Sequence, residues 1–218
     1  MATPRQTLAG LNQIPTAAVI AHEIGHTVVA YLQVGHGEKQ IEYYIAFRHR
    51  GNGEGAASYN PTDVSSPQDL IVRSLAGITN QAVHCPETIE EGLRKKLIGG
   101  SLFASDQCIE AGSDEAMEMA RHNAWSDWAN MIEETKRVGG DVGSRLVALR
   151  RAQKELVDLM RTERFKAIVE DMTADIARWL DEEPAQADFL ARYREVRIAQ
   201  VFSRHPQQVV PQNGQTAT

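Results

Sequence analysis

The chain has 218 residues, of which 42% are hydrophobic and 24% are charged, and its formal net charge is −6 at pH 7. This composition predicts a globular protein with a hydrophobic core, and the negative charge argues against a nucleic-acid or anionic-membrane partner. The two cysteines, Cys85 and Cys108, form no Cys-x-x-Cys pair, which argues against a disulfide scaffold or a thiolate zinc cluster.

The first half of the chain predicts two apolar helices with extended segments between them. Residues 16–33 are apolar on nearly every side, which is typical of a buried helix. Residues 41–47 are rich in β-formers and predict a strand, and a glycine-rich turn leads into a short extended segment at 56–59. Ser66-Pro67 begins a second apolar helix that reaches about Val83.

After Pro86 the pattern is helical to the end of the chain. The sequence predicts, in order, a short helix at 87–98, a helix capped by Ser113-Asp114 whose apolar positions continue to Met131, a longer helical segment between Gly139-Gly140 and Pro184, and a last helix at about 188–202. The predicted fold class is therefore mainly α with a small β-sheet.

The N-terminal segment carries one arginine and no apolar run. This composition is unlike that of a signal peptide, and the most apolar stretch is too short to cross a bilayer. A cytoplasmic location is therefore the expectation.

The motif His-Glu-x-x-His at residues 22–26 carries the chemistry that the sequence predicts. His22 and His26 are four residues apart, so they lie on one face of a helix and both imidazoles can bind one ion. Neutral imidazole suits Zn²⁺, and Glu23 can address a water at the open coordination position. Burying these three side chains without a partner would be costly, which also favours a metal. Gly25 costs a helix about 1 kcal/mol relative to alanine, and close approach of a backbone or a substrate would explain its presence.

This helix, with the sequence AHEIGHTVVA at residues 21–30, resembles the HEAGHA helix in the peptidase domain of FtsH-type ATP-dependent zinc proteases. Three later segments resemble parts of that domain in the same order. Residues 41–59 resemble its edge strand with the PRG…GYT ending, residues 75–82 its GGRAAEE helix, and residues 112–121 its GASND…IAR segment. The resemblance covers residues 16–131 and implies a zincin-like HExxH helix followed by a helical C-terminal half.

Carried over residue by residue, the resemblance makes His22 and His26 zinc ligands and Glu23 the catalytic base. It makes Asp114 the third ligand, because the family's third ligand is the aspartate of the GASND segment. Asp106 is the alternative, since Ala104-Ser105-Asp106 also resembles that segment and lies closer to the family's usual spacing.

Asp114 is favoured over Asp106 because an apolar helix ending in Met-Ala-Arg follows it directly. Either aspartate could instead serve only as a helix cap. If neither binds the metal, a glutamate such as Glu110 is the next candidate.

The chain also departs from the family. Asn80-Gln81 stand where the family has paired glutamates, and no Walker-type phosphate loop or membrane segment occurs. The resemblance thus implies a free-standing peptidase domain that binds neither ATP nor a membrane. We divide the chain into an N-terminal arm (1–14), a zinc peptidase-like core (15–138), C-terminal helices packing on the core (139–204) and a disordered tail (205–218).

The predicted function is a zinc endopeptidase that hydrolyses peptide bonds of unfolded or flexible polypeptides. Glu23 would take a proton from a zinc-activated water and pass it to the departing amine. An extended substrate would pair with the edge strand, so Ile41, Tyr43 and Ile45 are the predicted substrate-binding residues.

Two other hypotheses remain open. The chain could be a catalytically inactive zinc-binding module of the same fold, which the altered Asn80-Gln81 motivates and the intact Glu23 opposes. It could instead be a regulatory metallopeptidase that cleaves a repressor, but the further acidic and Leu-rich Met-Pro elements of that family are not found. The C-terminal helices could also mediate self-association into a homo-oligomer.

Overall fold

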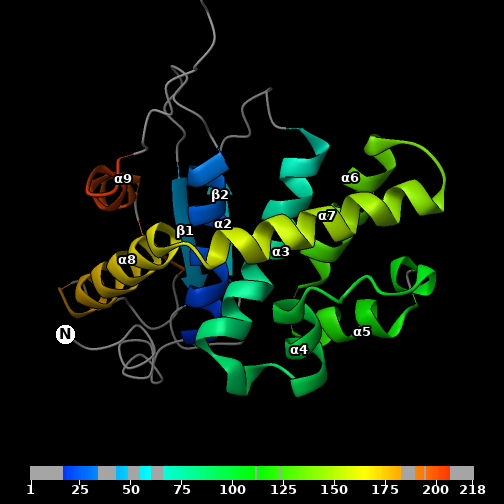
Figure 1. Ribbon diagram of the computed structural model, residues 1–218. Coiled ribbons are helices and arrows are strands. Elements are labelled where there is room, and N and C mark those ends of the chain that lie inside the picture. The colour runs from blue at the N-terminus through cyan, green and yellow to red at the C-terminus, as the bar shows by residue number, and fades with distance from the viewer. Residues whose placement is uncertain are drawn as a thin grey trace, which may run out of the picture.

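The computed structural model describes residues 17–33, 43–48, 55–59, 66–110, 112–122, 124–182, 190–193 and 195–206. Within these ranges the fold is mainly helical, as predicted (Figure 1). The helices are α2 (Ala17–Gln33), α3 (Pro67–His84), α4 (Glu91–Gly99), α5 (Asp114–Arg121), α6 (Trp125–Val138), α7 (Val142–Met160), α8 (Glu163–Glu182) and α9 (Glu195–Ser203). The 3-10 turns are η1 (Pro86–Thr88) and η2 (Asp106–Ile109), and the strands are β1 (Tyr43–Arg48), β2 (Gly55–Tyr59) and β3 (Leu190–Tyr193).

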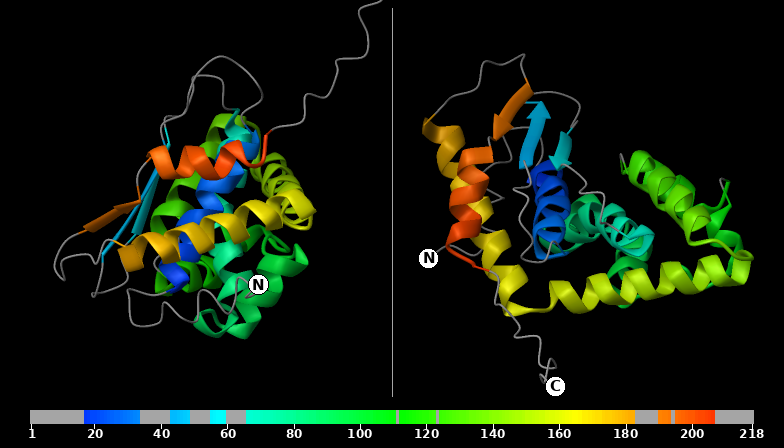
Figure 2. Two further views of the ribbon diagram at one scale, coloured as in Figure 1. Left: turned by 90° about the vertical axis from the view of Figure 1, so that its left-hand side faces the viewer. Right: turned by 90° about the horizontal axis from the view of Figure 1, so that it is seen from above.

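Helix α2 is the centre of the fold, as its apolar sequence predicts. It lies between α3 and α8 and contacts β1 and β2 (Figure 2). Its side chains from Ile20 to Ala30 are all buried. A helix with neighbours on every side can be apolar all round, because little of its surface is in water.

Gly25 permits the close contact between α2 and α3. A Cβ atom at this position would lie 2.5 Å from the carbonyl oxygen of Ala76 and 2.7 Å from Cβ of Asn80. No side chain fits there, so the backbone of α3 is the close neighbour that the mid-helix glycine predicted.

Helix α3 begins where the sequence predicts it. Ser66 is the N-cap of a capping box in which its hydroxyl accepts from the backbone N–H of Asp69 and the Asp69 carboxylate accepts from the Ser66 backbone. Pro67 occupies the first turn, where a missing N–H costs nothing. The helix then packs against α2, α6 and α7, so both of its ends are fixed relative to the centre of the fold.

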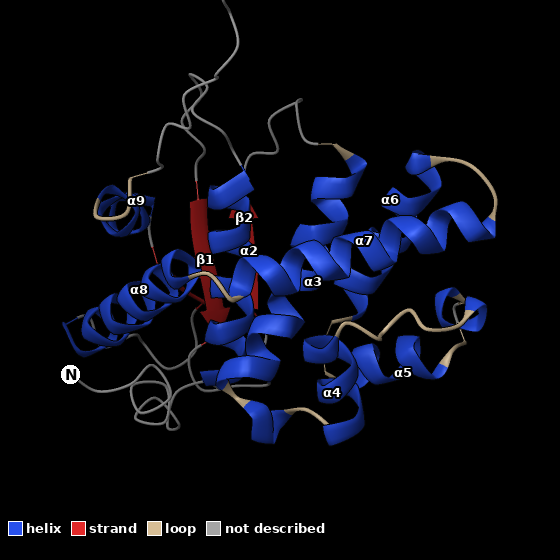
Figure 3. Ribbon diagram, viewed as in Figure 1, coloured by secondary structure: helices blue, strands red, loops and turns tan. Residues whose placement is uncertain are grey.

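The predicted helix that was to continue from Ser113 to Met131 is in fact two helices. Helix α5 ends at Arg121, and α6 begins at Trp125 (Figure 3). The backbone N–H groups of both His122 and Ala124 donate to the carbonyl of Met119, which ends α5. Helix α6 packs against α3, whereas α5 contacts η2 and α6.

The three strands form an antiparallel sheet in the order β2–β1–β3. Strand β1 pairs with β2 through registers from Tyr43↔Tyr59 to Phe47↔Gly55, and with β3 from Ile45↔Tyr193 to Arg48↔Leu190. The sequence predicted helix throughout this C-terminal stretch, which was wrong for residues 190–193. Pairing with β1, rather than local propensity, makes this segment a strand.

The sheet order also corrects the prediction of a substrate-binding edge strand. Strand β1 is the central strand, and its backbone from Ile45 to Phe47 is paired on both sides. The Ile45 side chain is completely buried. Neither its backbone nor its side chain is available to an added peptide strand. Tyr43 pairs only with β2 within the described residues, and Ile41 lies outside them.

None of the helices in the described ranges is both long enough and apolar enough to cross a membrane. The predicted N-terminal arm lies outside the described residues, as does the tail beyond residue 206.

Candidate metal centre

His22, His26 and Asp127 come together between α2 and α6. The Nε2 atom of His22 lies 2.8 Å from Oδ2 of Asp127, and Nε2 of His26 lies 3.3 Å from the same oxygen. The two imidazole centroids are 4.8 Å apart, with the ring planes at 70°. Among the described residues these three form the only group of His, Cys, Asp or Glu side chains whose ligand atoms converge closely enough for a metal ion.

The opposite nitrogens of both histidines are held by other acceptors. Nδ1 of His26 donates to the backbone carbonyl of Arg73 at 2.7 Å, and Nδ1 of His22 lies 3.2 Å from Oε1 of Gln81. A carbonyl oxygen can only accept, so Nδ1 of His26 carries a proton, and Nε2 is the nitrogen left to face Asp127. Metal-binding histidines characteristically have such a partner on the second nitrogen, which fixes the ring orientation.

Gly77 provides the space that the two imidazoles occupy. A Cβ atom at this position would lie 2.4 Å from Nε2 of His26 and 2.5 Å from Nε2 of His22. Any side chain at residue 77 would therefore collide with both candidate ligand atoms. The backbone of α3 forms one wall of the site, and glycine is the residue that leaves room beside the nitrogens.

Charge interactions hold the three side chains together. Burial raises the pKa of the Asp127 carboxyl, but the charge of His26 and hydrogen bonds from both imidazoles outweigh burial and bring that pKa well below its usual range. Burial likewise opposes protonation of His26, yet the Asp127 carboxylate raises the pKa of His26 to about 9. The site thus attracts positive charge, and a cation can replace the proton that His26 and Asp127 otherwise share.

Glu23 lies on the same buried helix, directly after the first histidine. Its side chain is 5% exposed, and its charge contributes to the raised pKa of His26. Glu23 therefore lies near enough for its charge to act on His26.

The donor set fits zinc. Two imidazole nitrogens and one carboxylate oxygen are a common set of three protein ligands for a zinc ion that keeps an open position for water. With zinc–ligand bonds of about 2.0–2.1 Å, tetrahedral geometry separates the ligand atoms by roughly 3.3 Å. The two nitrogen–oxygen distances, 2.8 and 3.3 Å, are close to this value, and all three ligand atoms lie within 4.8 Å of one another.

The site also remains in contact with solvent. The side chains of His22, His26 and Asp127 are 10%, 9% and 15% exposed, respectively. Structural zinc sites are enclosed by four protein ligands, whereas catalytic sites have three and an accessible fourth position. Within the described residues the group has three candidate ligands, and each of their side chains remains partly accessible.

No family model, curated protein or solved structure matches this chain. The resemblance to the FtsH-type peptidase domain is thus a prediction from the motif residues alone, and the site is interpreted from its own geometry.

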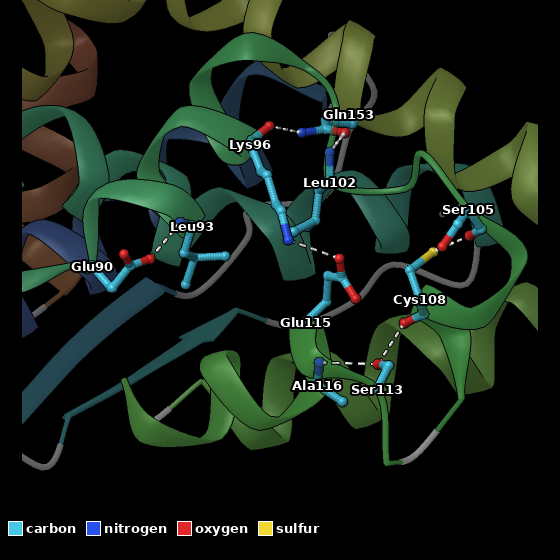
Figure 4. Close-up of polar contacts among 10 residues, drawn as sticks. All are labelled: Glu90, Leu93, Lys96, Leu102, Ser105, Cys108, Ser113, Glu115, Ala116 and Gln153. Carbon is cyan, nitrogen blue, oxygen red and sulfur yellow. Dashed lines mark hydrogen bonds and ion pairs between the residues drawn. The ribbon is translucent and has the colours of Figure 1, made fainter.

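The structure brings together two of the three predicted ligands, and it replaces the third. His22 and His26 converge as expected, but Asp127 takes the position that the sequence analysis gave to Asp114. Asp114 is exposed at the first turn of α5, and its charge acts on Lys96 rather than on the histidines. Lys96 itself pairs with Glu115 at 2.9 Å, in the cluster of polar contacts between α4 and α5 (Figure 4).

The other two candidates for the third ligand are also exposed. Asp106 begins η2, and Glu110 follows that turn. The neighbouring Ser105 carbonyl accepts from the Cys108 thiol at 2.8 Å (Figure 4). Arg150 donates to the nearby carbonyls of Phe103 and Ala104. These contacts fix the segment against α7, so neither acidic residue belongs to the group formed by His22, His26 and Asp127.

The signal that could have identified Asp127 is present in the sequence. A Ser-Asp pair occurs three times before or within a helical turn, at 105–106, 113–114 and 126–127. Treating residues 113–131 as one helix places Asp127 in a helix interior, so the third pair does not stand out as a helix start. With α6 beginning at Trp125, Asp127 lies in a first turn like the other two.

Proposed function

We propose that this protein is a zinc-dependent peptidase that hydrolyses peptide bonds of unfolded or flexible polypeptides. The observation that carries the proposal is the convergence of both histidines of the His-Glu-x-x-His motif on Asp127, 105 residues later in the chain. The second nitrogen of each ring is held by an acceptor, and the glutamate of the motif is buried beside the site.

Each residue has a defined part in this proposal. His22, His26 and Asp127 would hold the ion, and bound zinc would supply a Lewis acid and an acidified water. Glu23 would accept the proton of the attacking water and return it to the nitrogen of the departing amine. Arg73 and Gln81 would orient the two imidazoles through their Nδ1 atoms.

The proposal requires a flexible substrate because cleavage needs an extended backbone at a site formed between helices. Strand β1 was expected to bind this substrate at a sheet edge, but β1 is the central strand of the sheet. The substrate would therefore bind beside the candidate metal centre, without pairing with β1.

The test separates metal binding from catalysis. Purified protein should contain about one zinc per chain, and His22→Ala or His26→Ala should abolish it. Glu23→Gln should retain zinc and the fold but lose hydrolysis of casein by roughly 10²- to 10⁴-fold, because the base is removed and the ligands are not. Glu133→Gln is the matched control, since Glu133 pairs with Lys136 on an exposed face of α6.

Two outcomes would overturn the proposal. Stoichiometric zinc in the double variant His22→Ala/His26→Ala would place the metal elsewhere. If zinc-loaded wild type and Glu23→Gln were equally inactive on a range of unfolded proteins, the catalytically inactive zinc-binding module would be the better interpretation.

A further inference from the structure

A chain of hydrogen bonds links the candidate ligand His22 to the turn that follows α3. Nδ1 of His22 contacts Oε1 of Gln81 at 3.2 Å, and Nε2 of Gln81 donates to Oγ1 of Thr88 at 3.1 Å. The Thr88 hydroxyl in turn donates to the backbone carbonyl of Cys85 at 2.7 Å. Gln81 is buried on α3, whereas Thr88 lies in η1 at the surface.

The direction of every bond in this chain follows from the last acceptor. The Cys85 carbonyl can only accept, so the single hydroxyl hydrogen of Thr88 points toward it. Oγ1 of Thr88 then has only lone pairs to offer Gln81, and Gln81 must turn its NH₂ group toward Thr88. The carbonyl oxygen of the same amide is left facing His22.

This orientation determines the tautomer of His22. The Gln81 oxygen accepts, so Nδ1 of His22 must carry a proton. Nε2, which faces Oδ2 of Asp127 at 2.8 Å, is then the nitrogen that can exchange its proton for a metal ion. His26 reaches the same tautomer through a backbone carbonyl, which has a fixed polarity. His22 depends on a side-chain amide, which could be turned the other way, and Thr88 prevents this.

We propose that Gln81 and Thr88 are positioning residues that fix His22 in the tautomer required for metal binding. This inference rests on the metal centre proposed above, and it assigns a role to Gln81, one of the two residues that depart from the resembled family. An amide suffices here because the required property is an acceptor oxygen at Nδ1, and a carboxylate would supply the same acceptor.

The experiment measures the zinc dissociation constant of the full chain by competition with a chelator. Gln81→Leu removes the acceptor and should weaken zinc binding by roughly 10- to 100-fold, the usual effect of losing a partner behind a metal ligand. Gln81→Glu keeps an acceptor and should bind zinc at least as tightly as wild type. A purely structural role of Gln81 would not distinguish these two variants in this way.

Thr88 is tested with a conservative pair. Thr88→Val removes the hydroxyl and should weaken zinc binding by about fivefold, as expected for one lost hydrogen bond at a solvent-accessible position. Thr88→Ser restores the hydroxyl and should restore the affinity. The matched control is Thr79→Val, because the buried Thr79 hydroxyl donates only to the Leu75 carbonyl of its own helix, at 2.8 Å.

The ¹⁵N spectrum of the histidine side chains in the zinc-loaded protein gives an independent readout. It should show His22 protonated at Nδ1 in wild type, and this signal should be lost or broadened in Gln81→Leu. If Gln81→Leu binds zinc as tightly as wild type, the inference is overturned while the metal site stands. If wild type itself binds no zinc, the proposed function is overturned and the inference with it. Zinc binding without peptidase activity in wild type would leave the inference intact.

Discussion

Replacing Gly77 by alanine tests the geometry of the candidate site most directly. An alanine in the interior of a helix is ordinarily more stable than a glycine by about 1 kcal/mol. Here the added methyl carbon would lie 2.4 and 2.5 Å from the two Nε2 atoms, well inside contact distance. The imidazoles would have to move, although each is held at both nitrogens.

The expected loss can be worked out from the bonds that such a movement breaks. The two rings make four polar contacts, two to Asp127 and one each to Gln81 and the Arg73 carbonyl. If three are lost at about 1 kcal/mol each, the helix propensity gain of about 1 kcal/mol leaves a net loss of about 2 kcal/mol. For a protein of this size, such a loss lowers the melting temperature by roughly 4–8 °C.

The assay is thermal melting of the metal-free protein together with a zinc titration. Gly77→Ala should melt at a lower temperature and bind zinc at least 100-fold more weakly, because the methyl group crowds both ligand nitrogens. Gly99→Ala is the control, since no atom lies within 4 Å of a Cβ built at that helical position. If Gly77→Ala were as stable as Gly99→Ala and bound zinc normally, the imidazoles could not lie where the structure places them.

Three further results are expected. Asp127→Asn should weaken zinc binding strongly, whereas Asp114→Asn should leave it unchanged, and the reverse result in a zinc titration would restore the ligand expected from sequence. Gly25→Ala should lower the free energy of unfolding by about 1–3 kcal/mol in urea denaturation, because the Ala76 carbonyl leaves no room for a methyl group; unchanged stability would contradict the close contact of α2 with α3. Burial raises the pKa of the Cys108 thiol from its ordinary 9.0 to about 11. Between these pH values the thiol ionises in the unfolded chain but not in the folded protein, so the free energy of unfolding should fall as pH rises from 9 to 11. The fall in melting temperature should be smaller in Cys108→Ala, and an equal fall would exclude this thiol as a cause.

The sequence was sufficient where a segment's own residues determine its structure. Helix α2 follows from apolar residues on every side, and α3 from the Ser66-Pro67 start and its periodic apolar residues. The proximity of His22 and His26 follows from helical spacing alone. In each case the information lies within a few turns of one element.

The sequence did not predict the structure correctly where similar local patterns occur more than once and contacts with distant segments determine which of them takes a given position. Three Ser-Asp pairs look alike along the chain, and only the packing of α6 against α3 brings Asp127 rather than Asp114 to the histidines. Residues 190–193 form a strand because β1 is beside them, not because of their own pattern. Both errors concern pairings across more than a hundred residues, which a local pattern does not specify.

The separation of His22 from Asp127 has a consequence for the order of events during protein synthesis. At ribosomal rates of about 5–20 residues per second, the 105 residues between them take roughly 5–20 s to make. The second partner of β1 arrives later still, because β3 (Leu190–Tyr193) follows Asp127 in the chain. During this interval α2 has neither its full set of neighbours nor Asp127 beside its histidines. Completion of the candidate metal centre is therefore a late event, and a nascent chain that stops before α6 cannot form it.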